Sequence, residues 1–392
     1  MPKGSELARF RKQLLTWFQQ FQRDLPWRRD IDPYRVWLSE IMLQQTRVAA
    51  VIPYYERFLE RFPDVRALAE APQEEVLRLW SGLGYYSRAR NLQKAAQAIV
   101  AKHGGTFPKS LEDALALPGI GAYTAAAILS IAYGKELAVL DGNVARVLAR
   151  LCAVRGDLRA PKRWQALQER ADSLLDHESP GNWNQAMMEL GATLCTPRSP
   201  QCLLCPVADA CEARKLGIAE LLPEKRRKRE AVAVVLAAAV FVDEKERTLL
   251  LAPPTSEKGA NPAGVADHVP TLVSKMWHFP TVSASEDPAP ELGRFVRAML
   301  GKRALTFDLE AAEKVRHAVT YRDITIFPFR ISCKTLPQVA GAEAFPLDDL
   351  SSIAISNLTR KVAASVLAQA RSTKRPLHRV TVAVRAASAG NR

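Results

Sequence analysis

Two carboxyl groups stand where an acidic side chain could take part in chemistry. Glu40 lies within residues 37–46, on or beside the apolar face of an expected helix, and apolar surroundings raise the pKa of a carboxyl group. Asp141 follows a short apolar run on an expected turn, close to the start of another helix. A protonated carboxyl group and an ionised carboxylate are together what hydrolysis of a glycosidic bond needs. The residue pattern alone leaves an alternative for each: a solvated helix residue for Glu40 and a helix cap for Asp141.

Four of the six cysteines form a second group of reactive side chains. They follow the pattern Cys-x6-Cys-x2-Cys-x5-Cys at Cys195, Cys202, Cys205 and Cys211. In a reducing compartment such a cluster indicates a metal site before a disulfide framework. Four thiolates at this spacing satisfy either tetrahedral zinc or a [4Fe–4S] cube, and frequency alone slightly favours zinc.

A loop that leads into a helix precedes Asp141. Pro118 and Gly119 end the preceding helix, and Gly119 and Gly121 leave the backbone N–H groups of the next helix open to a ligand. Such N–H groups bind phosphate oxygens. The helix expected over residues 124–133 is nearly all small and apolar, so we expect it to be buried. A Gly-x-Gly loop by itself is weak evidence for a function.

Two further segments have a composition that suits nucleic acid. Trp27 and Arg28 could stack on a base and neutralise a phosphate, although a packed tryptophan with solvated charges is equally consistent. Residues 80–92 place Leu83 and Tyr85 on a glycine-containing hinge ahead of Arg88, which is the composition a base-flipping enzyme needs. The alternative is a hairpin whose leucine and tyrosine pack inward.

Length and charge set outer limits. A chain of 392 residues is long enough for two domains, because one hydrophobic core usually stops growing at about 250 to 300 residues. The net charge of +14 favours a polyanionic partner. The chain has no run of 18 or more apolar residues and no apolar signal segment at its start, so we expect a soluble intracellular protein.

The second half of the chain is expected to form a separate domain. After a charged linker, apolar runs rich in β-formers at 231–242, 248–251 and 324–331, with a helix near 290–300, predict an α+β fold. Residues 252–270 are rich in Pro, Gly and Ala and are expected to be a disordered insertion.

Together these motifs resemble the MutY-type adenine glycosylases of the endonuclease III superfamily. Residues 117–125 resemble that superfamily's helix-hairpin-helix loop, and the turn at Asp141 resembles its catalytic aspartate segment. Residues 37–46 resemble the segment that carries the general acid of the adenine glycosylases. The cysteine spacing equals the endonuclease III iron–sulfur motif, so the resemblance selects a [4Fe–4S] cluster. Residues 276–280 are similar to the Trp-x-Phe-Pro of the Nudix-like domain that closes these enzymes.

The resemblance implies a two-domain architecture. It predicts an all-α, two-part helical glycosylase domain over residues 1–215, with the helix-hairpin-helix at about 111–133 and the iron–sulfur loop at 195–211. A charged linker at 216–230 and an α+β Nudix-like lesion-recognition domain at 231–368 follow. A basic tail at 369–392 is expected to be disordered.

The resemblance also implies a role for individual side chains. Glu40 protonates adenine N7, Asp141 stabilises the cationic sugar, and Tyr123 and Asn143 orient these groups. The implied adenine pocket consists of Trp27, Arg28, Leu43, Val48 and Gln185. The implied DNA contacts are Gln44, Gln45, Leu83, Tyr85, Arg88, Gly119, Gly121, Arg198 and Thr320.

The implied activity is base-excision repair of adenine paired with 8-oxoguanine or guanine in double-stranded DNA, by a monomer in the bacterial cytoplasm, at the nucleoid. Tyr123 stands where strand-cutting relatives have a lysine, so an abasic-site product is expected. One departure concerns residues 319–321, Val-Thr-Tyr, where the family's lesion loop has Phe-Ser-His, so 8-oxoguanine discrimination stays open. The alternatives are an endonuclease III-like glycosylase of another base specificity and a non-catalytic iron–sulfur DNA-binding protein.

Overall fold

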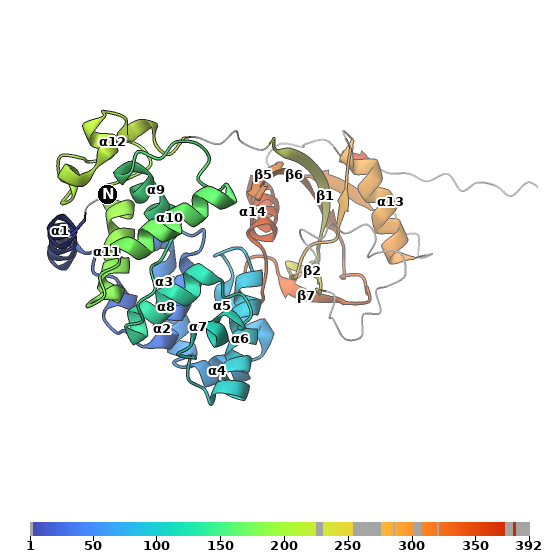
Figure 1. Ribbon diagram of the computed structural model, residues 1–392. Coiled ribbons are helices and arrows are strands. Elements are labelled where there is room, and N and C mark those ends of the chain that lie inside the picture. Colours follow the sequence, from blue (N-terminus) through green and yellow to red (C-terminus); the bar gives the residue numbers. More distant parts are fainter. Residues whose placement is uncertain are drawn as a thin grey trace, which may run out of the picture. The chain divides into compact units, whose positions relative to one another are not determined.

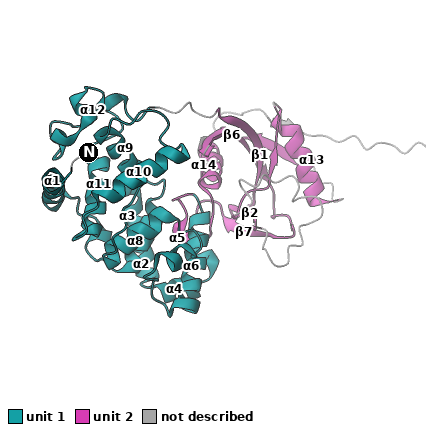
Figure 2. Ribbon diagram, viewed as in Figure 1, with its two compact units in different colours: residues 1–76, 85–228 teal, residues 77–84, 229–392 magenta. Residues whose placement is uncertain are grey.

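The chain folds into two compact units. The computed structural model describes residues 3–224, 230–253, 276–285, 287–301, 307–319, 321–372 and 379–381. Unit 1 comprises residues 1–76 and 85–228, and unit 2 comprises residues 77–84 and 229–392 (Figure 2). The short segment 77–84 therefore clusters with the second half of the chain, although it lies within the first half of the sequence.

Unit 1 is built from helices, as expected for a helical glycosylase domain (Figure 1). They are α1 (Ser5–Phe21), α2 (Pro33–Leu43), α3 (Val48–Arg61), α4 (Val65–Glu70), α5 (Gln73–Trp80), α6 (Ser87–His103), α7 (Leu111–Leu115), α8 (Ala122–Tyr133), α9 (Gly142–Leu151), α10 (Pro161–Leu174), α11 (Pro180–Thr193) and α12 (Glu212–Lys215). Residues 77–80 of α5 belong to unit 2. The short 3-10 helices are η1 (Pro26–Arg28), η2 (Ala208–Ala210) and η3 (Ala219–Leu221). No helix among the described residues is long and apolar enough to cross a membrane.

Local sequence signals set where the site-bearing helices begin. Asp32 caps α2 by accepting a hydrogen bond from the Arg35 N–H, and Pro33 occupies the first helical turn. The helix-hairpin-helix consists of α7 and α8, and Gly121 precedes α8. Helix α8 is buried along most of its length, as its small apolar residues predict. Asp141 caps α9 through the Val144 N–H.

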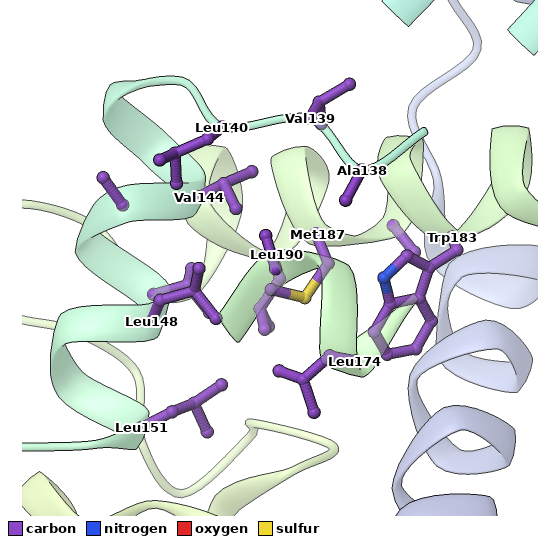
Figure 3. Close-up of a cluster of buried hydrophobic side chains, with 14 of the residues drawn as sticks. Ala138, Val139, Leu140, Val144, Leu148, Leu151, Leu174, Trp183, Met187 and Leu190 are labelled. Atoms are coloured by element: carbon purple, nitrogen blue, oxygen red, sulfur yellow. The ribbon is translucent and has the colours of Figure 1, made fainter. Parts of the chain in front are cut away.

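The core of unit 1 lies around α9 and α11. Val144, Leu148 and Leu151 of α9 pack with Met187 and Leu190 of α11 in one buried apolar cluster (Figure 3). The apolar residues of α9 recur every three or four positions, so they form a single buried stripe. This packing fixes the first turn of α9, where Asp141 lies.

Unit 2 is a mixed sheet with two long helices. The strand order is β7-β2-β1-β6-β4-β8, and β3 pairs with β1 and β5 with β6. The strands are β1 (Val232–Val242), β2 (Arg247–Leu251), β3 (Thr281–Ser283), β4 (Asp308–Ala311), β5 (Val315–Val319), β6 (Arg322–Ser332), β7 (Ala342–Pro346) and β8 (Arg379–Thr381). Strands β1 and β6 run parallel and the other pairs are antiparallel. The expectation of an α+β fold is confirmed.

Alternation along β1 places the two helices on opposite faces of the sheet. Leu236, Ala238 and Val240 belong to one apolar cluster with residues of α14 (Asn357–Ser372). Ala237, Ala239 and Phe241 belong to another with residues of α13 (Pro288–Leu300). Because successive strand side chains point to opposite faces, each helix covers its own face (Figure 1).

The segment expected to be disordered from residue 369 onward is partly ordered. Helix α14 continues to Ser372, and β8 pairs antiparallel with the edge strand β4. An unpaired strand edge provides backbone hydrogen bonds for such an added strand, which residue composition does not reveal. Residues 382–392, most of the insertion at 252–270 and linker residues 225–229 lie outside the described part of the chain.

Candidate active site

A cavity of about 610 Å³ in unit 1 collects the side chains predicted for catalysis. Helix α2 contributes Glu40, α8 contributes Tyr123, and the start of α9 contributes Asp141 and Asn143. All five predicted pocket residues line the same cavity, as do two predicted DNA contacts: Trp27, Arg28, Leu43, Val48 and Gln185, with Gln44 and Gln45. Tertiary structure thus brings together residues that lie up to 158 positions apart, from Trp27 to Gln185.

Glu40 is a buried acid with one close donor. Only 7% of the residue is exposed, and its Oε2 accepts a 2.7 Å hydrogen bond from the Tyr123 hydroxyl. Burial raises the pKa of Glu40 to about 7; the Tyr123 hydrogen bond lowers it, the nearby Asp141 raises it and Arg28 lowers it. Glu40 is therefore substantially protonated at neutral pH.

Asp141 is both a helix cap and a cavity residue. Its Oδ1 accepts a 2.7 Å hydrogen bond from the Val144 N–H, and its Oδ2 accepts one of 3.0 Å from the Asn143 amide. Burial raises the pKa of Asp141, whereas the hydrogen bonds from Val144 and Asn143 favour the ionised form and oppose that effect. The two readings of Asp141 left open by the sequence are therefore compatible.

Asn143 is itself held by a buried arginine that the sequence reading missed. Arg146 Nη2 donates to Asn143 Oδ1 at 2.9 Å and to the Gly191 carbonyl at 2.8 Å. Its Nε donates to the Cys195 carbonyl at 2.8 Å. A chain of hydrogen bonds thus leads from Asp141 to the first cysteine of the cluster. In the sequence, the feature that could have indicated Arg146 is its position as a charged residue beside the apolar stripe of α9.

A buried ion-pair network on the cavity wall was also missed. Glu189 of α11 is 1% exposed and pairs with Arg23 at 2.7 Å and with Arg28 at 2.8 Å. Burial would raise the pKa of Glu189, but the hydrogen bonds and charges of the two arginines outweigh it and lower the pKa to about 2. The signal was a lone glutamate in the apolar run Met187-Met188-Glu189-Leu190.

Two of the predicted DNA contacts differ from expectation. Leu83 is 7% exposed, so it packs inward, whereas the neighbouring Tyr85 is 40% exposed. Arg88 turns inward too, donating to the carbonyls of Ile41 and Met42 at 2.8 and 3.0 Å and also to that of Gln44. Since α2 leaves its last carbonyls without helical partners, Arg88 satisfies them and is held away from solvent.

The remaining predicted contacts lie on the surface or outside the described residues. Gly119 and Gly121 are exposed on the α7–α8 loop, and Gly119 has a φ of 77° that favours glycine. Arg198 is exposed in the loop between the first two clustered cysteines. Thr320 falls outside the described part of the chain.

The four clustered cysteines fit an iron–sulfur cluster. Burial and, to a smaller extent, the neighbouring thiols Cys195, Cys211 and Cys202 raise the pKa of the Cys205 thiol to about 12, so thiolates here need a bound cation. Tetrahedral zinc would bring its sulfur ligands to within roughly 4 Å of one another. Among the described residues no three potential ligands are close enough for a single ion. The four thiols lie close enough to influence one another's pKa, and four thiolates are the ligand set of a [4Fe–4S] cluster.

Comparison with known families agrees with this geometry. Residues 38–172 match the model of the HhH-GPD superfamily base excision DNA repair protein. Unit 1 contains an HhH-GPD domain. Residues 195–211 match the iron–sulfur binding domain of endonuclease III. The expected [4Fe–4S] cluster is thereby confirmed as the cofactor.

The similar curated proteins are adenine DNA glycosylases. The chain is 50% identical over 220 residues to that of Homo sapiens, covering 54% of this chain and 40% of the relative. It is 42% identical over 206 residues to that of Buchnera aphidicola subsp. Acyrthosiphon pisum, covering 52% of this chain and 59% of the relative. The chain thus spans about half the length of these relatives.

Solved structures similar to the chain include two glycosylases. A thermostable thymine-DNA glycosylase aligns with a TM-score of 0.49 and 29% identity, covering 54% of this chain and 97% of that chain. An endonuclease III in a non-covalent DNA complex aligns with a TM-score of 0.48 and 23% identity, covering 56% of this chain and 99% of that chain.

Proposed function

We propose that this protein is an adenine DNA glycosylase that extrudes adenine from duplex DNA and hydrolyses its bond to deoxyribose. The observation that carries the proposal is Glu40, a carboxyl group with a pKa of about 7 in the same cavity as Asp141. A protein that only binds DNA has no use for this pair. The similarity to adenine DNA glycosylases selects adenine as the base.

In the proposed reaction Glu40 supplies the proton. Adenine is a poor leaving group, so protonation at N7 must accompany cleavage of the glycosidic bond. The Tyr123 hydroxyl, 2.7 Å from Glu40 Oε2, orients the carboxyl group. After cleavage, the ionised Glu40 accepts a proton from the attacking water, which restores the acid.

Asp141 stabilises the sugar cation that forms when the bond breaks. Departure of the base leaves an oxocarbenium-like sugar, which a nearby carboxylate stabilises or briefly bonds. The Val144 N–H and the Asn143 amide each hold one oxygen of Asp141, so the carboxylate is oriented before the substrate arrives. The apolar side chains of Leu43 and Val48 and the amide of Gln185 suit a flat base with polar edges.

The product is an abasic site in an uncut strand. Strand cutting needs an amine that forms a Schiff base with the sugar. Within the described part of the chain no lysine lines the cavity, and Tyr123, in the first turn of α8, stands where the strand-cutting relatives implied by the resemblance have a lysine.

The proposed substrate is adenine opposite 8-oxoguanine or guanine in duplex DNA, bound by a monomer. The net charge of +14 suits the phosphate backbone, and the exposed residues Gly119 and Gly121 at the start of α8 suit contact with individual phosphates. Unit 2 is proposed to read the base opposite adenine.

Base release from three duplexes tests the proposal. We expect release from adenine opposite 8-oxoguanine and opposite guanine, and none from thymine glycol. Glu40→Gln should slow adenine release about 10²- to 10⁴-fold, the usual contribution of a general acid. Release of thymine glycol would instead indicate another glycosylase, and release of no base would indicate a binding protein. Borohydride trapping of a covalent adduct during turnover would contradict the uncut product.

A further inference from the structure

The loop that leads to Tyr85 is fastened by the start of helix α14. Ser81 is 8% exposed, and its hydroxyl donates a 2.8 Å hydrogen bond to the Ile355 carbonyl. The same oxygen accepts a 2.8 Å hydrogen bond from Arg360 Nη2. One residue on, the Gly82 carbonyl accepts a 3.1 Å hydrogen bond from the Asn357 amide. These contacts all lie within unit 2, to which residues 77–84 belong (Figure 2).

The Ser81 hydroxyl both donates and accepts a hydrogen bond in this arrangement. Because its hydrogen points to Ile355, its lone pairs are left to accept from Arg360. A hydroxyl that donates and accepts at once strengthens both bonds, particularly where the donor is charged. Ser81 therefore has one preferred orientation.

The backbone between Ser81 and Tyr85 leaves little freedom to the residue that follows. Trp80 is fully buried, and its indole N–H donates to the Gly84 carbonyl at 3.1 Å. Leu83 is buried as well, which fixes the middle of the loop. Tyr85 then adopts a φ of 49°, a left-handed conformation that is unfavourable for a non-glycine residue. Such a conformation persists only where the surroundings impose it.

We propose that Arg360 is a positioning residue that acts through Ser81 to hold Tyr85 ready for insertion into the DNA duplex. The inference rests on the proposed function, in which Tyr85 enters the base stack as adenine leaves it. Tyr85 is the exposed aromatic of this loop and directly follows its fastened part, Ser81–Gly84. Extrusion of the base thus depends on a residue of unit 2 that lies 275 positions from Tyr85.

The test follows base extrusion separately from chemistry. A duplex carrying 2-aminopurine in place of the target adenine, opposite guanine, gains fluorescence when that base leaves the stack. With saturating protein, Arg360→Ala and Ser81→Ala should each slow this rise about three- to tenfold, the range expected for losing one ordinary hydrogen bond. Arg360→Lys keeps a donor and should restore most of the rate.

Two further variants separate positioning from general damage to the fold. Lys361→Ala removes the same charge from the next position of α14, where Lys361 donates to the Arg316 carbonyl, and should leave the rate unchanged. Tyr85→Ala should slow the rise, and adding Arg360→Ala to it should have no further effect, because the two residues act in one step. Melting temperatures of all variants serve as the measure of folding.

The possible outcomes distinguish the two proposals. Suppose that the unsubstituted protein releases adenine opposite guanine, and that Arg360→Ala extrudes 2-aminopurine as fast as the unsubstituted protein does. The role of Arg360 is then refuted and the proposed function stands. The same holds if Arg360→Ala and Tyr85→Ala slow extrusion independently. If the unsubstituted protein releases no adenine at all, the proposed function fails and the role of Arg360 fails with it.

Discussion

At the scale of single residues, the surroundings of Glu40 turn an ordinary carboxyl group into an acid at neutral pH. Burial is the largest cause of its raised pKa, and the Tyr123 hydrogen bond opposes it without cancelling it. The balance suits the proposed role, because a carboxyl group with its usual pKa would hold no proton at pH 7. The same burial makes the ionised form costly to the fold.

Glu40→Gln should therefore stabilise the protein at alkaline pH. The folded state holds the proton more tightly than the unfolded chain, so stability linked to Glu40 is fully present below its ordinary pKa of 4.5 and is lost as pH rises to about 7. Glutamine carries no charge and avoids this loss. At pH 8 the free energy of unfolding of the Glu40→Gln variant should exceed that of the unsubstituted protein by up to about 3 kcal/mol.

Urea titrations at pH 5 and pH 8 measure this difference. The gain should be much smaller at pH 5, where Glu40 is protonated in the folded protein. An equal gain at both pH values would show that Glu40 is not the titrating group.

At the scale of elements, the crossing of α9 and α11 sets the position of Asp141. Gly191 of α11 lies against Asn143, and a Cβ atom added there would come within 2.8 Å of Asn143 Cβ and 3.1 Å of its backbone. No real Cβ atom tolerates the shorter distance, and the backbone contacts give way only if a helix moves. The close approach also places the Gly191 carbonyl where it accepts from Arg146 Nη2, the group that donates to Asn143 Oδ1.

Gly191→Ala should slow adenine release by at least about tenfold, because misplacing a catalytic group by 1 Å can cost about 100-fold. It should also destabilise the fold by about 1–3 kcal/mol through overpacking. Single-turnover base release and urea unfolding measure the two effects. Gly142→Ala is the matched control, because its added Cβ on α9 meets no atom within 4 Å. Parental activity in Gly191→Ala would mean that α9 and α11 separate without moving Asp141.

At the scale of the whole molecule, each unit has its own core. The cluster around α9 and α11 belongs to unit 1, and the clusters on both faces of the sheet belong to unit 2. The iron–sulfur loop joins the core of unit 1, because Arg150 of α9 donates to Cys195 Sγ at 3.2 Å and to the Thr196 carbonyl at 2.8 Å. Loss of the cluster should therefore affect the two units differently.

Removing iron should lower the melting temperature of unit 1 and leave that of unit 2 unchanged. A ligand bound only by the folded state stabilises it by mass action, and each kcal/mol corresponds to about 2–4 °C in a unit of this size. Calorimetry with hydrogen-exchange mass spectrometry can assign each transition to a unit. The iron-loaded protein should be brown. An equal shift in both units would contradict separate stabilisation.

Sequence alone could predict whatever depends on neighbouring residues. The cap of α2 at Asp32, the apolar stripe of α9 and the β-rich apolar run at 231–242 are all local patterns, and the structure agrees with them. The resemblance to a known family also predicted the residues that line the cavity. A family motif carries information about distant partners that periodicity lacks.

Only the tertiary structure determined which partners the buried and half-buried polar side chains have. Arg88 satisfies the end of α2, Glu189 pairs with two arginines over 160 positions away, and Ser81 is fastened by Arg360. A composition of arginines, glycines and aromatics predicted exposed DNA contacts at Leu83 and Arg88, yet Leu83 is buried and Arg88 is half-buried, with its Nη1 donating to carbonyls at the end of α2. The physical reason is that an ion pair or a buried hydrogen bond depends on separation in space, and residues far apart in the chain acquire that separation only when the cores have packed.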